Sequence, residues 1–402
     1  MKYDVKPIYN DESTIEFYIK GDKHHLIPSD IMLIITCKVP KDYVVDNGAL
    51  NKLFDSHEVL LNNDAITKRS NKNEHPYYDF FTKECQYSLS HDNQVTEGWF
   101  DSYNVDASAF DPSAESYSKI TSERLLRNRT MAQRTISSKD YRVYRFCGPI
   151  ASPICRQFKT LPPGTSMKIN FKRSNPKMVL IADASEKGAV SYNSAEYYKS
   201  NNIDIIDARL EVPFAVSEKL DREFNLRPYD LSWDIDDFQV RTQIIETGRT
   251  EFQFNLNSGG DLCRFLIGGL VTPEAYYGSF DKSATNFQLR GVKKIEILVN
   301  EEVLPGYPIM CEKGLGSLPY IQYLKLCKWY QNSLASGFMN LYEFEHSNFM
   351  ITQDFGDINE NSGWLSVRLH FDKPTTENMI FVGLMIFPKK LTMDQNKNFS
   401  VV

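Results

Sequence analysis

Apolar residues in this 402-residue chain come mostly in short runs, which clusters of Asn, Asp, Gly and Pro separate. Runs of this length between turn-forming residues predict β-strands, and many such strands in series are typical of a sandwich or a barrel. Several runs are nearly continuously apolar, which predicts cover on both faces of a sheet. The pattern predicts strands at 14–20, 31–39, 58–61, 141–146, 166–172, 178–182, 203–212, 238–245, 251–256, 264–271, 294–299, 365–371 and 379–387.

Two segments follow a helical period instead. Each carries one apolar stripe at helical spacing, which predicts an amphipathic helix lying on the edge or rim of a sheet. Pro76 and Pro319 suit the first turn of these helices, where a missing N–H costs nothing. The stripes consist of Tyr77, Phe80, Phe81 and Cys85 in one segment and of Tyr320, Tyr323, Leu324 and Cys327 in the other.

The two halves of the chain repeat one plan. EVLLNNDAI at 58–66 recurs as EILVNEEVL at 296–304, and a Pro-Tyr helix start follows each. Asn and Asp tolerate positive φ, so the polar residues inside both copies predict tight reversals. Further on, MKINFK at 167–172 matches VRLHFD at 367–372, and residues 178–181 match 379–382. Matches in the same order indicate an internal duplication.

The length of the chain favours two domains, because a single core rarely grows to 402 residues. We place the boundary near Ser217, which gives domains at 1–217 and 218–402. Residues 203–212 fit the last strand of the first half, although a loop-like stretch precedes them. The segment 88–134 loses periodicity and is rich in Ser, Asp and Asn, so we interpret it as a long loop insertion.

Two consecutive all-β halves, each with a strand, a tight turn, a helix and a closing pair of strands, fit a double jelly-roll. The predicted fold class is therefore all-β, with two tandem eight-stranded jelly rolls and short helices in the loops.

Composition and charge exclude several classes. Hydrophobic residues at 42%, aromatic residues at 13% and charged residues at 24% suffice for two ordinary cores. A formal net charge of −6 argues against a protein that binds nucleic acid over its whole surface. The start of the chain is polar and charged, and no apolar run approaches the ~20 residues that a spanning helix needs. We expect neither a signal peptide nor a membrane span.

One segment is strongly basic. Residues 119–145 hold eight Lys and Arg residues against two acids. The functional interpretation is contact with packaged nucleic acid or with an acidic neighbouring subunit; the alternative, which we favour, is a solvated loop. The candidate contact residues are Arg124, Arg127, Arg129 and Arg134.

Signatures of catalysis and metal binding are absent. The sequence has no phosphate-binding loop, no nucleophile elbow and no zincin motif. His24 and His25 are adjacent and would point to opposite faces of a strand, so they could not share one metal. The seven Cys show no Cys-x-x-Cys spacing and fit buried small hydrophobes.

An acidic stretch around Trp233 offers carboxylates that a hard cation prefers. A solvated acidic loop between strands is the interpretation we favour, since charge runs usually face water. The stretch consists of Asp230, Asp234, Asp236 and Asp237. We expect no catalytic, cofactor-binding or metal site, and no enzyme.

Several segments resemble a known family. NGALNKLFDSHEVLLNND (47–64) followed by HPYYDFF is similar to the first-domain signature of major capsid proteins from Polinton/Maverick elements and from adintovirus-like or virophage-like viruses. The resemblance extends to residues 146–174, to ILVNEEVLPGYPI at 297–309 and to GWLSVRLHFDKP at 363–374. The last strand departs from the family's acidic ending, and we expect Pro388 to stop its ladder.

The resemblance implies a structural major capsid protein in the virion, assembled in the host cytoplasm or nucleus. Its partners would be two further copies in a trimeric pseudo-hexameric capsomer, neighbouring capsomers, a minor penton protein and packaged DNA. It implies no cofactor and no catalytic residue. Three alternatives remain: a tandem β-sandwich that binds carbohydrate or another ligand, a metal-dependent cupin-like enzyme, and a minor capsid protein of the same kind of virus.

Overall fold

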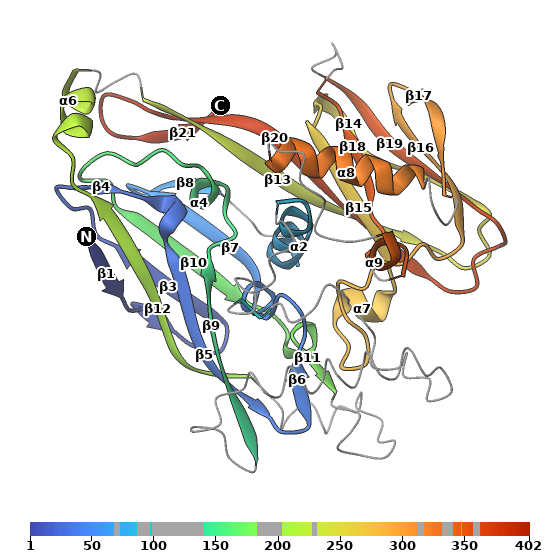
Figure 1. Ribbon diagram of the computed structural model, residues 1–402, viewed down its shortest axis with the longest axis horizontal. Coiled ribbons are helices and arrows are strands. Elements are labelled where there is room, and N and C mark those ends of the chain that lie inside the picture. Colours follow the sequence, from blue (N-terminus) through green and yellow to red (C-terminus); the bar gives the residue numbers. More distant parts are fainter. Residues whose placement is uncertain are drawn as a thin grey trace.

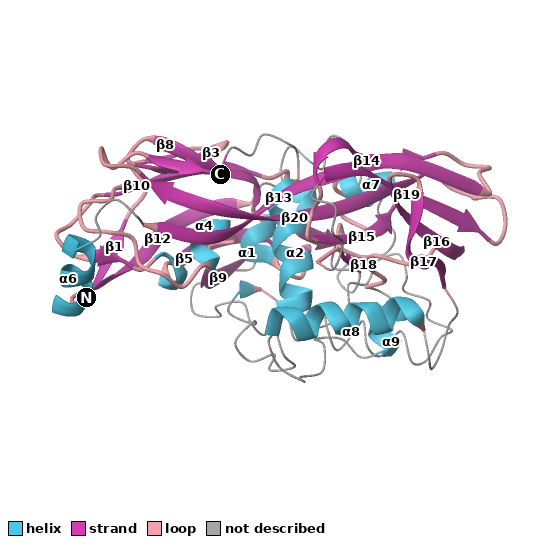
Figure 2. Ribbon diagram, turned by 90° about the horizontal axis from the view of Figure 1, so that it is seen from above, coloured by secondary structure: helices cyan, strands magenta, loops and turns pink. Residues whose placement is uncertain are grey.

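Two β-sandwiches lie side by side in the computed structural model, with helices between them and at their rims (Figures 1 and 2). The structure describes residues 1–67, 73–86, 97–98, 140–182, 203–226, 231–311, 317–331, 341–346, 348–356 and 362–402.

The first sandwich consists of two antiparallel sheets. One has the order β1 (Lys2–Val5), β12 (Asp204–Ala215), β5 (Met32–Pro40) and β9 (Tyr141–Pro149), and β4 (His25–Leu26) also pairs with β12. The other has the order β2 (Tyr9–Asn10), β3 (Thr14–Ile19), β10 (Met167–Arg173), β7 (Phe54–Leu61) and β8 (Asp64–Thr67). A separate short pair joins β6 (Tyr43–Val45) to β11 (Leu180–Ala182).

The second sandwich has the same construction. One sheet has the order β13 (Ser232–Ile245), β20 (Met379–Met393), β15 (Phe265–Val271) and β18 (Ile351–Asp354), with β21 (Phe399–Val401) on β20. The other has the order β14 (Glu251–Asp261), β19 (Ser362–Phe371), β16 (Val292–Val299) and β17 (Glu302–Met310).

Strand order establishes the fold class. When β2, β4, β6, β11 and β21 are set aside as short additions, each half keeps eight strands among the described residues. Numbered along the chain within its half, the strands have the order 1-8-3-6 in one sheet and 2-7-4-5 in the other, identically in both halves. Two eight-stranded sandwiches of this kind make a double jelly-roll, so the predicted fold class is confirmed.

The repeated hairpin has the same turn in both halves. Asn62 and Asn63 have φ of 49° and 75°, and Asn300 and Glu301 have φ of 52° and 72°. Two successive positive φ angles define the type I′ turn, whose twist matches that of paired strands. The predicted tight reversals are therefore confirmed.

The predicted match of residues 167–172 with residues 367–372 is misaligned by two residues. Leu61 pairs with Met167, and its counterpart Val299 pairs with Leu365. Phe171 therefore corresponds to Leu369 rather than to Phe371. A shift of two residues keeps every side chain on its own face of the strand, so the sequence pattern could not reveal it.

The match of residues 178–181 to 379–382 was wrong. These first-half residues form the 3₁₀ helix η5 (Pro176–Met178) and the short strand β11, whereas the counterpart of β20 is β12. A short apolar run does not determine which strand of a sheet it forms.

Pro388 does not stop the last ladder, contrary to our expectation. It lies inside β20 and pairs with Asp236 of β13. On the other side of β20, pairing with β15 ends at Ile386 and pairing with β21 begins at Leu391. Proline is tolerated where one side of a strand needs no N–H donor.

Short helices occupy the connections: η1 (Pro28–Asp30), α1 (Ala49–Lys52), α4 (Pro153–Arg156), α6 (Glu218–Leu226), α7 (Pro273–Tyr277) and α9 (Leu341–His346). The two longest described helices are α2 (Glu74–Gln86) and α8 (Leu318–Gln331), which follow the fifth strand of their halves. Both were predicted. However, α2 lies between the two sandwiches rather than on a rim (Figure 1), and its residues 74–85 are buried on every side.

The two hydrophobic cores exchange residues. Trp233, Leu391 and Phe399 belong to the second half by sequence but pack in the core of the first sandwich. Conversely, Tyr77 and Phe81 of α2 pack in the core of the second. The predicted division at Ser217 falls between β12 and α6, and it stays a prediction about separable domains.

Candidate functional site

The predicted basic contact residues Arg124, Arg127, Arg129 and Arg134 lie outside the described residues, as does nearly all of the predicted insertion at 88–134. The described end of the basic segment lies on β9. There, Arg142 is buried and donates a hydrogen bond to the carbonyl of Tyr43 over 2.6 Å, while Arg145 is exposed. Arg142 therefore serves the fold.

Asp230 of the acidic stretch lies outside the described residues, and Asp234, Asp236 and Asp237 do not form the loop between strands that we had expected. From Ser232 onward the stretch belongs to β13, where Trp233 faces the core and Asp234 faces solvent. Burial raises the pKa of Asp236, and Arg156 lowers it in part. Alternation of polar and apolar residues here was the missed signal for a strand. Within the described ranges, no group of three His, Cys, Asp or Glu residues could hold a metal.

Two histidines that lie 18 residues apart in the sequence meet in the first core. His57 and His75 have their Nδ1 atoms 2.8 Å apart, and His75 Nε2 lies 3.0 Å from Asn51 Oδ1. Burial, with smaller contributions from Lys83 and Arg156, lowers the pKa of His75 to about 3. Sequence reasoning singled out the adjacent pair His24 and His25, and no sequence pattern signalled the contact between His57 and His75.

The thiols are free, and most are buried. Burial raises the pKa of Cys37, Cys155 and Cys263 to about 12, which removes the thiolate needed for nucleophilic chemistry. The prediction of buried structural thiols is confirmed for five of the seven, while Cys147 and Cys311 are half-buried.

The main candidate for a functional feature is the junction between the sandwiches, which α2 and α8 build together. Tyr78 of α2 stacks on Phe238 of β13 with ring centroids 3.7 Å apart and planes at 5°. The hydroxyl of Tyr77 donates to the carbonyl of Ala284 over 3.2 Å. These contacts attach the helix of the first half to the second sandwich.

Buried charges reinforce this junction. Lys83 lies 3.0 Å from Asp79 one turn earlier and also pairs with Glu97. Arg156 reaches Asp79 at 3.4 Å, and its guanidinium lies 4.6 Å from the centre of the Tyr78 ring. Removing one member of a buried pair leaves an uncompensated charge, so this network fixes where α2 sits.

A second buried ion pair lies in the first half and is hydrogen-bonded to the second half. Lys52 of α1 pairs with Asp46, and its ammonium donates to the hydroxyl of Thr285 over 2.8 Å. Ser283 donates to the same Asp46 carboxylate over 2.7 Å. No sequence pattern pointed to these residues, because lysine is rarely buried unless it is paired.

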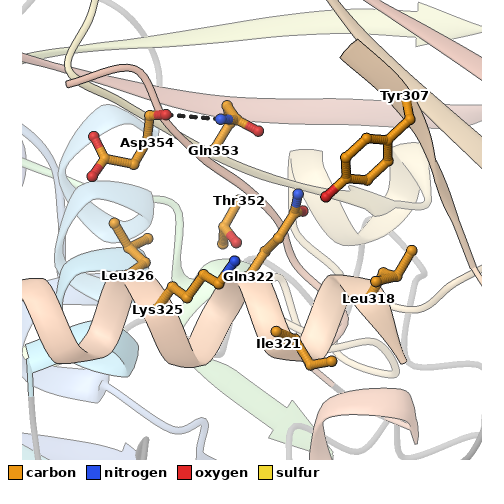
Figure 3. A pocket seen from close by; sticks show the side chains of 9 residues that line it. All are labelled: Tyr307, Leu318, Ile321, Gln322, Lys325, Leu326, Thr352, Gln353 and Asp354. Carbon is orange, nitrogen blue, oxygen red and sulfur yellow. Dashed lines mark hydrogen bonds between the residues drawn. The ribbon is translucent and has the colours of Figure 1, made fainter. Parts of the chain in front are cut away.

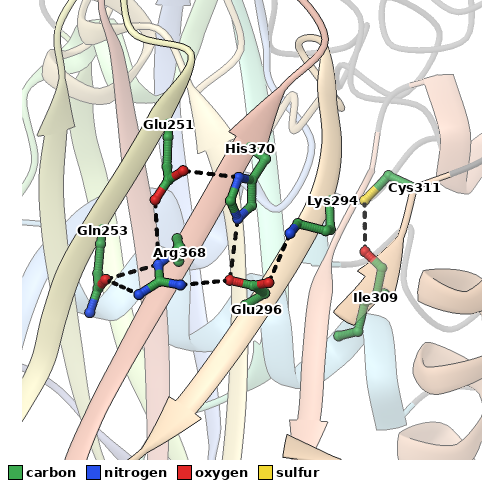
Figure 4. Close-up of polar contacts among 8 residues, drawn as sticks. All are labelled: Glu251, Gln253, Lys294, Glu296, Ile309, Cys311, Arg368 and His370. Atoms are coloured by element: carbon green, nitrogen blue, oxygen red, sulfur yellow. Dashed lines mark hydrogen bonds and ion pairs between the residues drawn. The ribbon is translucent and has the colours of Figure 1, made fainter. Parts of the chain in front are cut away.

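The outer face of the second sandwich carries an ordered polar cluster, shown in Figure 4. His370 places Nε2 3.2 Å from Glu296 and Nδ1 3.3 Å from Glu251, while Arg368 reaches Glu296 at 3.0 Å. Burial raises the pKa of Glu296, but hydrogen bonds from Lys294, His370 and Arg368 outweigh it and lower the pKa to about 2. The cluster is a charge-paired surface.

Double jelly-rolls define the class to which this fold belongs, and comparisons with known proteins agree. No family model matches the sequence, and no curated protein matches it. Solved structures do match. A chain of the Sputnik virophage structure determined by cryo-EM is similar with a TM-score of 0.66 and 9% identity, over 100% of this chain and 88% of that chain.

Two further structures support the same conclusion. The mavirus major capsid protein matches with a TM-score of 0.60 and 10% identity, over 100% of this chain and 90% of that one. A chain of the PBCV-1 virus capsid matches with a TM-score of 0.58 and 10% identity, over 100% of this chain and 96% of that chain. At such identities the likeness shows the fold: this chain is a double jelly-roll protein that resembles virophage and viral capsid chains, as its sequence motifs predicted.

Proposed function

We propose that this chain is a structural major capsid protein, three copies of which form a pseudo-hexameric capsomer of an icosahedral shell. The observation that carries the proposal is the identical strand order in both halves. Three chains with two like sandwiches each supply six like modules, so a closed three-fold ring has a nearly six-fold outline. The role is structural rather than enzymatic.

The junction supports this role, because a shell tile needs a fixed angle between its two modules. The stacking of Tyr78 on Phe238, the hydrogen bonds that Lys52 and Asp46 form with the second half, and the exchange of core residues all restrain the sandwiches relative to each other. Buried networks of this kind rigidify and specify one arrangement.

Exposed apolar residues supply surface for contacts between subunits. Aromatic residues are enriched in the cores of protein interfaces. Phe158 is 91% exposed and Trp364 is 59% exposed. We infer contacts with neighbouring capsomers and a penton protein in the virion, with Arg124, Arg127, Arg129 and Arg134 as candidate contacts for packaged DNA or adjoining subunits.

Residues 1–217 and 218–402 would be the two jelly-roll domains of the tile. None of the helices in the described ranges has the length and apolar character needed to cross a membrane.

Native mass spectrometry tests the proposal. We expect a species of three times the 46.4 kDa mass of one chain, and negative-stain images with a hexagonal outline. A chain that stays at 46.4 kDa at high concentration contradicts the proposal. Glycan binding by such a monomer would favour the tandem ligand-binding alternative instead.

A further inference from the structure

A hollow of about 290 Å³ opens beside α8, between the outermost strands of the two sheets of the second sandwich, β17 and β18. We call it the α8 hollow, and Figure 3 shows its walls. It is lined by Tyr307, Leu318, Ile321, Gln322, Lys325, Leu326, Thr352, Gln353 and Asp354.

Two buried polar atoms in its wall lack hydrogen-bond partners. Thr352 is only 1% exposed, and its Oγ1 has no partner. Gln353 donates from its amide nitrogen to the carbonyl of Asp354 over 2.7 Å, but its Oε1 is likewise buried without a partner. Buried polar groups are nearly always hydrogen-bonded, so these two indicate a ligand that supplies the missing bonds.

The charged side chain available to a ligand in the α8 hollow is Lys325, which is positive. Asp354 is occupied, because its carboxylate accepts from Arg264 Nε at 2.9 Å and from the main-chain N–H of Gly356 at 2.8 Å. Lys325 is exposed and forms no ion pair within the described part of the chain. Figure 3 shows the ends of Lys325, Gln322 and Thr352 turned into the same space.

These groups fit one ligand chemistry. An ammonium, an amide N–H and a hydroxyl are all donors, and together they match the acceptor oxygens of a carboxylate. Gln353 Oε1 is an acceptor and matches a main-chain N–H. A carboxylate and an N–H occur together in an acidic residue of a peptide.

The rim of the hollow fits a protein partner. Tyr307 is 53% exposed and Ile321 is 40% exposed, so two large apolar side chains flank the donors. A contact of this composition, apolar with a few placed polar groups, is typical of protein interfaces. Moreover, β17 and β18 both end their sheets, and α8 packs against both of them.

We propose that the α8 hollow receives an Asp or Glu side chain from a second copy of this chain. This inference rests on the proposed capsid function, which brings copies into contact. Charge complementarity favours a second copy, since the chain has 52 acidic against 46 basic residues and presents acidic side chains on its surface. The carboxylate pairs with Lys325 and Thr352, and Tyr307 and Ile321 cover its stem.

A zero-length carbodiimide cross-linker tests the contact, because it joins a lysine to a carboxylate only when the two touch. Assemblies would be prepared from a mixture of unlabelled and ¹⁵N-labelled full-length chains. We expect a peptide pair that links Lys325 to an acidic residue and carries both isotopes. Links at Lys325 that are only within one chain, or no link there while other inter-chain links form, would overturn the proposal.

Variants give a second measurement. Lys325→Glu should weaken self-association at least tenfold in sedimentation velocity, and Thr352→Val should weaken it several-fold, with the melting temperature of the monomer unchanged by Lys325→Glu. Lys373→Glu is the matched control, since Lys373 is exposed and lies away from the hollow. Wild-type association by Lys325→Glu would refute the α8 hollow as a contact and leave the capsid proposal standing. A wild-type chain that never associates would refute the capsid proposal itself.

Discussion

The hydroxyl of Tyr323 donates a hydrogen bond over 2.8 Å to the main-chain carbonyl of Glu84. The two residues lie on α8 and α2, helices that hold the same place in the two halves. Cys327, one turn after Tyr323, has its thiol 3.9 Å from the same carbonyl. The duplicated helices therefore contact each other and join the halves directly.

Tyr323→Phe removes this bond and keeps the ring. Because the carbonyl of Glu84 loses a buried donor, we expect the free energy of unfolding to fall by about 1–2 kcal/mol. Chemical denaturation measures the change. Tyr18→Phe is the control, since Tyr18 is 42% exposed and its substitution should change stability by less than about 0.5 kcal/mol. Equal effects of both variants would contradict a structural role for the bond.

Separation of the halves should prevent folding. A fragment of residues 1–217 lacks Trp233, Leu391 and Phe399, which complete the first core. The exposed apolar surface should make the fragment aggregate or remain loosely packed. Near-ultraviolet circular dichroism and thermal melting measure packing. Co-expression of both fragments should restore it, whereas a cooperative melt of either fragment alone would refute this prediction.

Charge removal at the junction should be costly. Asp79→Ala leaves the buried Lys83 with only Glu97 and takes a counter-charge from the half-buried Arg156, so we expect a loss of about 1–3 kcal/mol in stability. Asp234→Ala is the control, because Asp234 is exposed and lies 3.9 Å from Lys159. Exposed pairs of this kind contribute about 0–1 kcal/mol. Urea denaturation measures the free energy of unfolding of both variants. Equal losses in the two variants would contradict a role for the Asp79 network in holding α2.

Stability should fall in acid through His75. Its pKa is about 3 in the folded chain against 6.5 for the ordinary side chain. Between these values the unfolded chain binds a proton that the folded chain excludes, so stability decreases as pH falls from about 6.5. His75→Gln should make the melting temperature less dependent on pH in this window. A melting temperature of His75→Gln that depends on pH as steeply as that of the wild-type chain would contradict this prediction.

Turn geometry should matter equally in both halves. Asn62 Oδ1 accepts from the N–H of Ser166 over 2.9 Å, and Asn300 Oδ1 accepts from that of Trp364 over 2.9 Å. Asn→Ala at either position loses this bond and strains a positive φ, so we expect a loss of about 1–3 kcal/mol. Asn→Gly relieves the strain and should recover part of the lost stability. Asn255→Ala, on an exposed strand position, is the control for thermal melts.

Structural features that depend on residues close together in the chain could be predicted from the sequence. Strand runs, the Asn62 and Asn300 turns and the two helices follow from local pattern, and their repetition predicted two jelly rolls. The sequence could not reveal contacts that only the folded chain creates. The pairing of His57 with His75, the burial of Lys52 and the α8 hollow each join residues from distant segments. Their residue types alone fit an exposed surface equally well.

The exchange of core residues constrains how such a chain can be recombined. A hybrid that joins residues 1–217 to the second half of a relative would bring foreign versions of Trp233 and Phe399 into a core that they must fill. Trp233 also donates from its indole to the carbonyl of Thr160 over 3.0 Å, so shape and hydrogen bonding must both match. Chimeras that keep the start of β13, the end of β20 and all of β21 from the same parent as the first half should be viable more often. Chimeras cut at the duplication boundary should be viable less often.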